Sequence, residues 1–402
     1  MIKEREVVIV DYARSAFGKL GGGLRELSAS EIAGEVIKGL VQKTKIQERA
    51  FVDSAIVGCA HGCSKTQAVA RYAALYAGLP YETSATFVEM QCGSSIMALN
   101  QAVWKIKADM AEIVICGGTE CHSQHPAFMS TTTPPYKELA PICYDKGLTP
   151  IQERDIPMIC VSDKIAKLCG ISRTECDEFA LRSQERLQAG YQNGTIGPEI
   201  LPITMPATRK TAERVIDQDE FPRPDTTFEG LSRLRPIYLD GVTTAGNASG
   251  LNDGAAFMLV MTAEKAAELG YEPIARWVTC AHVGYYEDLM GLAPCYSNLK
   301  AMKHAGLGLD DIDVIECNEA FAAQNLGVIC QMEKESGRTI NQAKWNPNGG
   351  AIAVGHPNGA SGARITIFAM RQLEKTGGRY GMISACCGGG LGATTIIENL
   401  KR

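Results

Sequence analysis

Cys92 is the residue of this sequence whose position best suits a chemical role. It directly follows a β-like run at residues 87–90 and opens a segment, residues 96–106, in which apolar residues recur at helical spacing. At a helix start the unpaired N–H groups and the dipole favour a thiolate, so we expect a lowered pKa for this thiol. Cys92 is therefore a candidate nucleophile. The competing interpretation is a small buried side chain, the usual role of one cysteine among fifteen.

His356 is one of only six histidines and lies in the glycine-rich stretch 348–364. A turn packed with glycine lets backbone and ligand approach closely, and Pro357 stiffens the exit from it. An imidazole in such a turn is suited to taking the proton of a thiol. We therefore expect a base at His356, in preference to a solvated turn histidine.

A further candidate group lies where the strand-like run 381–385 ends. There, Cys386 and Cys387 precede Gly388 and two more glycines. Glycine N–H groups beside a thiol are suited to holding an oxyanion, and by chemistry alone the two thiols are equally good. Residues 388–393 also match a dinucleotide-binding fingerprint, but a strand-like run at 394–397 follows where the phosphate-binding helix should start.

Asn318 follows a strand-like run at residues 313–317 and begins the segment 318–322, Asn-Glu-Ala-Phe-Ala. Its amide could position a water molecule or a carbonyl oxygen. It could also be the N-cap of a following helix, and the two roles are compatible.

Two short segments are rich in potential metal ligands. Residues 59–63 hold two cysteines and His61, and Cys116 is followed by Cys121 and His122. The C-x₃-C spacing is loose and no matching C-x₂-C pair occurs, so we expect no metal site.

The elements that must position these residues repeat along the chain. The first half opens with a strand at 7–11, a helix capped by Ser28 or Ser30 and a strand at 54–57, and residues 275–280, 298–304 and 313–317 repeat this plan. Cys92 precedes a helix and a strand at 112–116 that ends at two glycines, just as His356 precedes a helix at about 360–375 and the strand at 381–385. This repetition predicts a duplicated α/β fold.

Residues 120–250 differ in composition, because prolines crowd both ends and only 175–189 reads as a firm helix. We interpret this stretch as a loop-rich insertion that carries binding residues. The predicted domains are an N-terminal half (1–121 plus 251–274), an inserted loop domain (122–250) that carries binding residues, and a C-terminal half (275–402).

Composition excludes several classes of protein. The net charge of −5 and the scattered basic residues argue against a nucleic-acid partner. We expect no membrane contact, since no run of 18 apolar residues occurs, and no signal peptide precedes the first strand. Fifteen cysteines in a chain of 402 residues then favour free thiols in a reducing cytoplasm.

The motifs together resemble the thiolase family over nearly the whole chain. Four blocks carry the resemblance: residues 91–95, residues 244–254, residues 318–324, and the His356 block with the Cys386 block after it. The resemblance implies a five-layered αβαβα thiolase fold built from two related halves, with a loop domain inserted in the first.

The resemblance also implies a role for each motif residue. Cys92 would be the nucleophile, His356 the base and Cys386 the second acid/base. Asn318 would hold a water in one oxyanion hole alongside the histidine, and the N–H groups of Cys92 and Gly388 would form another. The candidates for binding CoA are Ser249, which would contact the pantetheine chain, and Ala245, Tyr238 and Met158.

The implied reaction is a reversible Claisen condensation of two acyl-CoA units, as from acetyl-CoA to acetoacetyl-CoA, or the thiolytic cleavage of 3-ketoacyl-CoA. It would pass through acyl-Cys92 with ping-pong kinetics. CoA and acyl-CoA would be substrates, with no permanently bound cofactor, in a cytoplasmic homodimer or homotetramer of fatty acid metabolism. Four basic residues of the insertion have two possible roles: they bind the CoA phosphates, or they belong to a solvated charged loop. They are Arg209, Lys210, Arg214 and Arg223.

Three alternatives are weaker. A ketoacyl-synthase-like enzyme typically pairs its cysteine with two histidines, and Cys386 stands in the place of one. A non-catalytic CoA- or lipid-binding relative would have lost the nucleophile, and a thiol-redox enzyme would need a C-x-x-C motif. Two departures from the family pattern are Ser95, where glycine is common, and Pro157, where short-chain biosynthetic thiolases tend to have histidine. The second leaves the preferred acyl chain open.

Overall fold

The computed structural model describes residues 5–128, 147–207, 209 and 212–402. Nine strands form one continuous path of hydrogen-bonded neighbours, in the order β11-β12-β13-β10-β1-β9-β5-β3-β4. The first half of the chain supplies β1 (Val7–Ser15), β3 (Ser54–Gly58), β4 (Ser84–Val88), β5 (Ile113–Cys121) and β9 (Asn252–Thr262). The second half supplies β10 (Ala275–Gly284), β11 (Ile312–Cys317), β12 (Tyr380–Cys387) and β13 (Leu391–Asn399).

The two halves repeat one strand topology, which confirms the predicted duplication. In the first, β1–β9 and β9–β5 are antiparallel and β5–β3 is parallel. In the second, β10–β13 and β13–β12 are antiparallel and β12–β11 is parallel. The halves meet where β1 pairs antiparallel with β10, in the register Val8 to Arg276 and Ile9 to Ala275.

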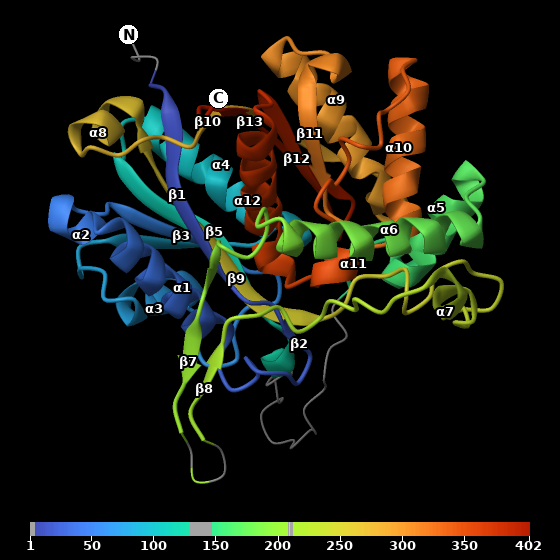
Figure 1. Ribbon diagram of the computed structural model, residues 1–402, viewed down its shortest axis with the longest axis horizontal. Coiled ribbons are helices and arrows are strands. Elements are labelled where there is room, and N and C mark those ends of the chain that lie inside the picture. The colour runs from blue at the N-terminus through green and yellow to red at the C-terminus, as the bar shows by residue number, and fades with distance from the viewer. Residues whose placement is uncertain (1–4, 129–146, 208, 210–211) are drawn as a thin grey trace, which may run out of the picture.

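Helices cover both faces of each half-sheet and complete five layers. The outer layers are α1 (Ala29–Thr44) with α3 (Val69–Tyr76), and α9 (Ala293–Ala305) with α10 (Ala322–Ser336). The middle layer is α4 (Ser94–Lys107) with α12 (Asn358–Thr376), which lie near the centre of the molecule (Figure 1). The expected αβαβα fold is therefore confirmed.

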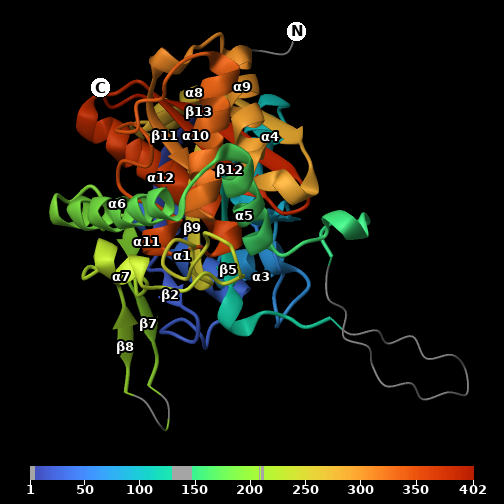
Figure 2. The same ribbon diagram turned by 90° about the vertical axis from the view of Figure 1, so that its right-hand side faces the viewer.

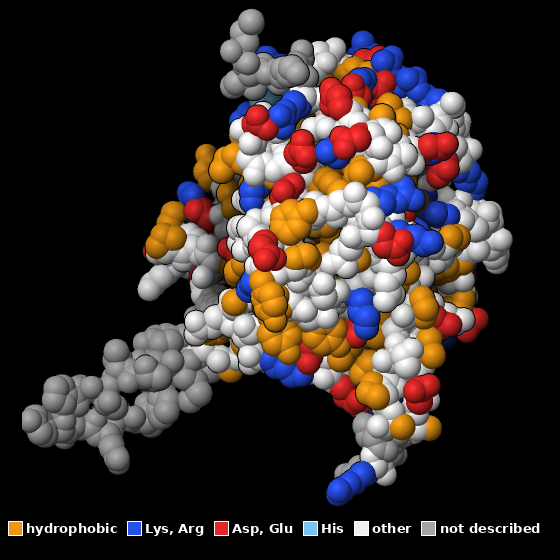
Figure 3. All heavy atoms as spheres, turned by 90° about the vertical axis from the view of Figure 1, so that its left-hand side faces the viewer, with side chains coloured by type: hydrophobic (Ala, Val, Ile, Leu, Met, Phe, Trp, Pro, Cys, Tyr) orange, Lys and Arg blue, Asp and Glu red, His pale blue; other side chains and the backbone are white. Residues whose placement is uncertain are grey.

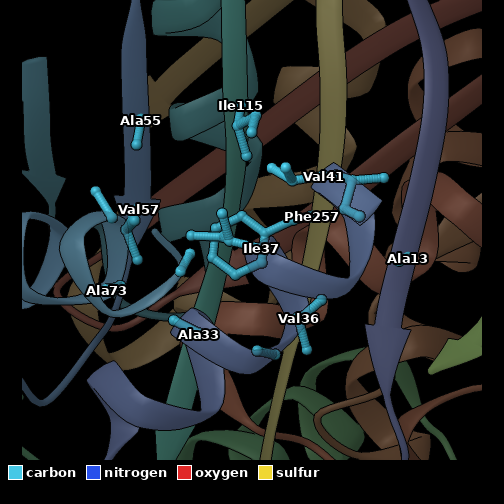
Figure 4. Close-up of a cluster of buried hydrophobic side chains, with 14 of the residues drawn as sticks. Ala13, Ala33, Val36, Ile37, Val41, Ala55, Val57, Ala73, Ile115 and Phe257 are labelled. Carbon is cyan, nitrogen blue, oxygen red and sulfur yellow. The ribbon is translucent and has the colours of Figure 1, made fainter. Parts of the chain in front are cut away.

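The alternation of side chains along each strand divides the core between layers. In β5, Ile113 and Ile115 pack with the outer helices, whereas Val114 and Cys116 face the middle layer. Figure 4 shows Ile115 beside Ile37 of α1 in the outer cluster. Because both faces are buried, these strands read as continuous apolar runs rather than as alternating ones.

The first helix shows how local sequence sets a boundary. Ser28, one of two candidate caps, accepts the Glu31 N–H while the Glu31 carboxylate accepts the Ser28 N–H. This reciprocal capping box starts α1 at Ala29.

The two middle helices pack almost backbone to backbone. A Cβ at Gly362 would lie 2.8 Å from the Ile96 nitrogen, so only glycine fits there. Ser95, the departure from the family pattern, accepts a 2.9 Å hydrogen bond from the Ala363 N–H and so joins α4 to α12. This close contact brings the start of α4, which follows Cys92, against the start of α12, which follows His356.

The sequence suggested that the strand ends at Gly117 and Gly118, but β5 continues through both glycines to Cys121. A Cβ at Gly117 would lie 2.1 Å from the Ala256 carbonyl oxygen, and one at Gly118 would lie 2.0 Å from that of Gly359. The two glycines therefore admit neighbouring backbone rather than a turn.

The connection between β5 and β9 holds more regular structure than expected. Besides α6 (Arg173–Gln192), which contains the predicted helix, it has α5 (Met158–Cys169), which sequence reasoning missed. Its other elements are α7 (Phe228–Ser232), β6 (Ile200–Leu201), β7 (Ile203–Met205) and β8 (Arg214–Ile216). The β7–β8 hairpin projects from the layered body (Figure 2).

The remaining elements are short: α2 (Ile46–Arg49), α8 (Ala263–Glu268), α11 (Ala351–Val354) and β2 (Gly18–Lys19). On the face drawn in Figure 3, acidic and basic side chains are interspersed. Within the described ranges, no helix has the length and low polarity required to cross a bilayer.

Candidate active site

Cys92 lies in a tight turn between β4 and α4. Residues Gln91–Gly93 form a 3₁₀ turn, and α4 begins at Ser94. The Ser94 hydroxyl donates to the Gln91 carbonyl and accepts from the Met90 N–H, while Gln91 has a φ of 48°, which is rare for a side-chain-bearing residue. The turn is thus fixed from both sides, and it holds the thiol almost fully buried.

His356 contacts this thiol directly. Its Nε2 lies 3.2 Å from the Cys92 Sγ, and its Nδ1 lies 2.6 Å from the Ser361 Oγ. The Ser361 hydroxyl donates its single proton to the Pro357 carbonyl, 3.0 Å away, so it accepts from His356. The imidazole proton is therefore on Nδ1, and the lone pair of Nε2 faces the thiol.

The backbone around His356 is fixed by Asn252, the first residue of β9. The Asn252 Oδ1 accepts the His356 N–H at 2.9 Å, and its amide group donates to the Gly18 carbonyl. Gly355 has a φ of 104°, and a Cβ there would lie 2.5 Å from the Asn252 Cγ. The glycine-rich turn is thus required where the first half of the chain approaches the base.

The resting pair is a neutral thiol beside a neutral imidazole. Burial raises the pKa of Cys92, and the nearby Glu120 carboxylate raises it further. Burial also lowers the pKa of His356. The predicted lowering of the Cys92 pKa is therefore wrong, because loss of solvent outweighs the effect of the start of α4 two residues later.

Asn318 lies beside the same imidazole. Its Nδ2 is 3.4 Å from the His356 Nε2, and its Oδ1 accepts from the Arg364 guanidinium at 3.4 Å. The suggested N-cap role is wrong, because α10 begins only at Ala322 and Phe321 occupies the N-cap position. The Asn318 N–H instead donates to the Ser384 carbonyl, which ties this residue to β12.

The structure distinguishes Cys386 from Cys387, which the sequence did not. Cys387 belongs to the middle-layer core, and a Cβ at Gly93 would lie 2.6 Å from its sulfur. Cys386 points to the other face of β12, into a cluster with Met290 and Ala320, both of which line the cavity above Cys92. Burial raises the pKa of both thiols well above the usual value.

A cavity of about 930 Å³ opens from Cys92 and His356. Its walls include four more of the predicted site residues: Gly388, Ser249, Ala245 and Met158. Cys386 and Asn318 are buried behind the lining, and both are fully enclosed by protein. The cavity is apolar over most of its wall, with side chains such as Phe221, Ile159 and Leu251. Its reactive side chains are Cys92 and His356.

The remaining predicted binding residues are Tyr238 and the basic residues of the insertion, and only some of them line the cavity. Tyr238 is 43% exposed and lies outside the lining, although its neighbour Ile237 is part of it. Of the four basic candidates, Arg223 lines the cavity, whereas Arg214 pairs with Glu26 on the surface. Lys210 lies outside the described residues.

Sequence reasoning missed a polar cluster next to Cys92 and His356, centred on Glu120. Glu120 is buried and accepts N–H groups from Ala60 at 2.9 Å and Gly359 at 3.0 Å. Burial favours a raised pKa for its carboxyl group, but the neighbouring His61 and His122 lower it overall, so the group stays ionised. His61 and His122 lie beside Glu120, and the His125 ring packs against His61. Within the described ranges no three potential ligands have a geometry that would hold a metal ion.

A buried thiol in contact with an oriented imidazole, both in the lining of a largely apolar cavity, is suited to covalent acyl transfer. Models of two thiolase domains match the chain: the N-terminal domain matches residues 7–264 and the C-terminal domain residues 271–399. The chain belongs to the thiolase family and is an acyltransferase that acts by Claisen condensation and thiolysis.

Relatives of known name support this assignment. The beta-ketoadipyl-CoA thiolase of Acinetobacter baylyi is 40% identical, with 98% of this chain and 100% of that protein covered. The acetyl-CoA acetyltransferase of Chromobacterium violaceum is 39% identical, with 98% and 99% covered. Neither the ketoacyl-synthase-like enzyme nor the non-catalytic relative is favoured by these likenesses.

Solved structures agree. The acetyl-CoA acetyltransferase of Bacillus anthracis has a TM-score of 0.90 at 35% identity, with 98% of this chain and 99% of that chain covered. Human mitochondrial 3-ketoacyl-CoA thiolase in complex with CoA has a TM-score of 0.88 at 35% identity, with 98% of each chain covered.

Proposed function

We propose that this thiolase works through an acyl group carried on Cys92. The observation that carries the proposal is the 3.2 Å contact between the Cys92 Sγ and the His356 Nε2, whose lone pair faces the thiol. As the thiol attacks a carbonyl, its proton passes to Nε2. The bond being formed offsets the cost of charge separation in this buried site.

Cys386 is the second acid/base group. The raised pKa keeps Cys386 protonated at rest, so in condensation it first gives its proton to the CoA thiolate that leaves as Cys92 is acylated. The Cys386 thiolate then removes a proton from the methyl group of acetyl-CoA. The resulting carbanion attacks the acyl group on Cys92 and displaces the Cys92 sulfur, which takes back the proton held on His356. In thiolysis the steps reverse, and Cys386 protonates the departing enolate. The burial of Cys386 beside cavity-lining residues supports this role, since a thiol with a raised pKa is a poor resting anion and a good proton holder.

Two oxyanion sites stabilise the charge that develops on oxygen. The Cys92 and Gly388 N–H groups receive the oxyanion of the tetrahedral intermediate. A water held by Asn318, together with His356, receives the enolate oxygen. Each such donor contributes about 3 kcal/mol to lowering a barrier of this kind. The orientation of Asn318 by Arg364 supports the second site, because it leaves the amide N–H₂ on the side of His356.

CoA lies along the wall formed by Ser249, Ala245 and Met158, with its pantetheine chain against Ser249. Arg223 at the cavity wall is the candidate partner of its phosphates. Tyr238 remains a candidate only for the exposed end of the ligand, since it stands outside the lining. CoA and acyl-CoA are substrates in this scheme, and no resident cofactor or metal takes part.

The inserted segment between β5 and β9 supplies this wall. We retain the division into an N-terminal half (1–121 plus 251–274), a binding insertion (122–250) and a C-terminal half (275–402). It is supported by the position of the Ser249 and Ala245 wall on the insertion and of Cys92 and His356 on separate halves.

We propose a homodimer or homotetramer in which the edge strand β4 is covered. β4 ends the strand path, and exposed apolar side chains lie on and near it, among them Phe87, Tyr81 and Trp104. An open edge with apolar side chains is a surface that pairs readily with another chain.

The fourteen described cysteines are all free thiols, several of them at least partly exposed. This supports the proposed place in the cytoplasm, where thiols stay reduced, and a role in fatty acid metabolism is proposed with it.

Acyl-enzyme formation is directly testable. Incubation with acetyl-CoA should add one acetyl group to the peptide that contains Cys92, as seen by mass spectrometry after rapid acid quenching. The Cys92→Ser protein should carry no such adduct. Full labelling of that variant would overturn the proposal.

A further inference from the structure

The helix that follows the proposed base is capped by a carboxylate from the other half of the chain. Pro357 occupies the N-cap position of α12, and its ring offers no acceptor for a first-turn N–H group. The Ala360 and Ser361 N–H groups donate to the Pro357 carbonyl oxygen. The Gly359 N–H donates instead to the Glu120 Oε2 at 3.0 Å. Glu120 thus stands where an N-cap side chain normally acts, although it belongs to β5, 239 residues away.

The Glu120 carboxylate is itself held in place by backbone. It is buried, and the same Oε2 accepts the Ala60 N–H at 2.9 Å, while its Oε1 accepts the His61 N–H at 3.3 Å. These two N–H groups belong to the loop after β3, the strand that pairs parallel with β5. The carboxylate is ionised, and negative charge at the start of a helix is favourable because of the helix dipole.

The start of α12 is also pressed against the ends of these two strands. A Cβ at Gly359 would lie 2.3 Å from the Thr119 carbonyl oxygen and 2.6 Å from the Cys59 Cα. The His122 Nε2 adds a further contact, 3.2 Å from the Asn358 Oδ1. The first turn of α12 is therefore attached to the ends of β3 and β5, both in the N-terminal half.

This attachment reaches the proposed base because His356 lies two residues before α12 begins. Its Nδ1 bonds to Ser361 in the first turn of the helix, and its Nε2 lies 3.2 Å from the Cys92 Sγ. Proton transfer between such groups requires heavy atoms about 2.6–3.2 Å apart, so a shift of this turn would weaken the contact.

We propose that Glu120 is a positioning residue for acylation: its carboxylate caps α12 across the two halves of the chain and so holds the His356 imidazole at the Cys92 thiol. The inference rests on the proposed function. In the step concerned, the Cys92 sulfur bonds to the thioester carbonyl carbon, and the thiol proton passes to the His356 Nε2. CoA leaves as a thiolate that takes its proton from Cys386. Glu120 is not among the side chains that line the cavity, so it acts through His356.

The charge of Glu120 also acts on the reacting pair. Burial raises the pKa of the Cys92 thiol most, Glu120 raises it further, and Glu89 adds to this effect. Removing the Glu120 charge therefore lowers the Cys92 pKa and increases the fraction of thiolate at a fixed pH. Burial lowers the pKa of His356 most. The Glu120 charge opposes this effect, and three groups add to it: His122, Arg364 and His61.

Two substitutions separate the cap from the charge. Glu120→Ala removes both, and the rate of acetyl transfer from acetyl-CoA to Cys92 should fall about 10- to 100-fold with an unchanged KM. Glu120→Gln keeps an oxygen for the Gly359 N–H, so this rate should fall less. Because the amide carries no charge, iodoacetamide should alkylate Cys92 of this variant about 3- to 30-fold faster than in wild-type protein at about pH 8.

The matched control is Glu175→Ala, which removes a capping carboxylate from the exposed start of α6. It should lower stability and leave both rates unchanged. The inference is wrong if wild-type protein is acetylated and Glu120→Ala keeps the wild-type rate, or if Glu120→Gln is alkylated no faster than wild type. If Glu120→Ala fails to fold, Glu120→Asp, one methylene shorter, replaces it, and a wild-type rate leads to the same conclusion. Absence of acetyl transfer in wild-type protein would instead overturn the proposed function.

Discussion

The hydrogen bond of Ser361 leaves the lone pair of the His356 Nε2 facing the Cys92 thiol. Its Oγ lies 2.6 Å from the His356 Nδ1 and gives its own proton to the Pro357 carbonyl. Ser361 sits in the first turn of α12, which begins two residues after His356, so the start of this helix places the group that sets the tautomer of the imidazole.

Removing this hydroxyl should slow acylation without abolishing it. In Ser361→Ala, Nδ1 loses its acceptor in a buried place, so the imidazole no longer holds its proton there. We expect the rate of acetyl transfer to Cys92 to fall about 10- to 100-fold, the effect of one such hydrogen bond. Rapid-quench mass spectrometry measures it. An unchanged rate, with an unchanged unfolding temperature, would show that the contact does not set the tautomer.

Acylation should stay active at mildly acidic pH. Burial lowers the pKa of His356 below its ordinary value of 6.5, so the neutral, proton-accepting form persists as the pH falls through 6.5. We expect the acetylation rate to show no decline between pH 7.5 and 6, values chosen to bracket the ordinary histidine pKa of about 6.5. A titration with a midpoint near 6.5 would contradict the inferred burial.

The same burial should make Cys92 slow to react with iodoacetamide near neutral pH. Its raised pKa keeps the thiol protonated, so alkylation should increase steadily with pH up to about 9, where an ordinary thiol of pKa about 8.5 would already level off. Mass analysis of the Cys92 peptide at each pH checks this. A plateau at pH 7 would instead show a resting thiolate.

The neighbouring thiols of β12 give a matched pair of variants. Cys386→Ala should keep acetyl transfer to Cys92 while condensation falls about 10²- to 10⁴-fold, the usual loss of an acid/base group. Cys387→Ala, on the opposite face of the strand, should keep condensation and only lower stability by about 1 kcal/mol. Equal loss of condensation in both variants would mean that condensation depends on the integrity of β12 and not on the Cys386 thiol.

The close backbone contact between the two halves can be tested by replacing a glycine at that contact with alanine. In Gly118→Ala the new Cβ would lie 2.0 Å from the Gly359 carbonyl oxygen, so the backbone at the start of α12 must move. We expect a loss of about 3 kcal/mol, or several degrees in the unfolding temperature. Gly284→Ala has nothing within 4 Å of the new atom and serves as control. Equal unfolding temperatures would show that the contact is loose.

The repeated order of strands and helices was predictable from sequence, because apolar runs and helical spacing are local signals. So were Cys92 and His356, each placed just before a helix. The direction of the Cys92 pKa shift was not predictable, because it depends on burial and on groups such as Glu120 that come from other elements. The helix α5 was missed because its start directly follows Pro157 and its first turn contains Ile159 and Val161, residues more typical of strands.

Contacts between distant segments were beyond sequence reasoning. Glu120 bonds to Ala60 and to Gly359, which lie 60 and 239 residues away, and a lone glutamate after a strand gives no sign of this. The choice between Cys386 and Cys387 likewise required the direction of each side chain, which follows from the strand register rather than from residue type.

The middle layer has a further consequence for the working enzyme. The proposed nucleophile, Cys92, comes from one half of the duplicated chain and the proposed base, His356, from the other, 264 residues apart, yet their facing atoms are 3.2 Å from each other. Neither half can react alone, and a small slip of α4 along α12 separates the pair while both helices stay intact. Activity therefore depends on the packing between the two halves. In mild denaturant, activity should disappear before helical structure does.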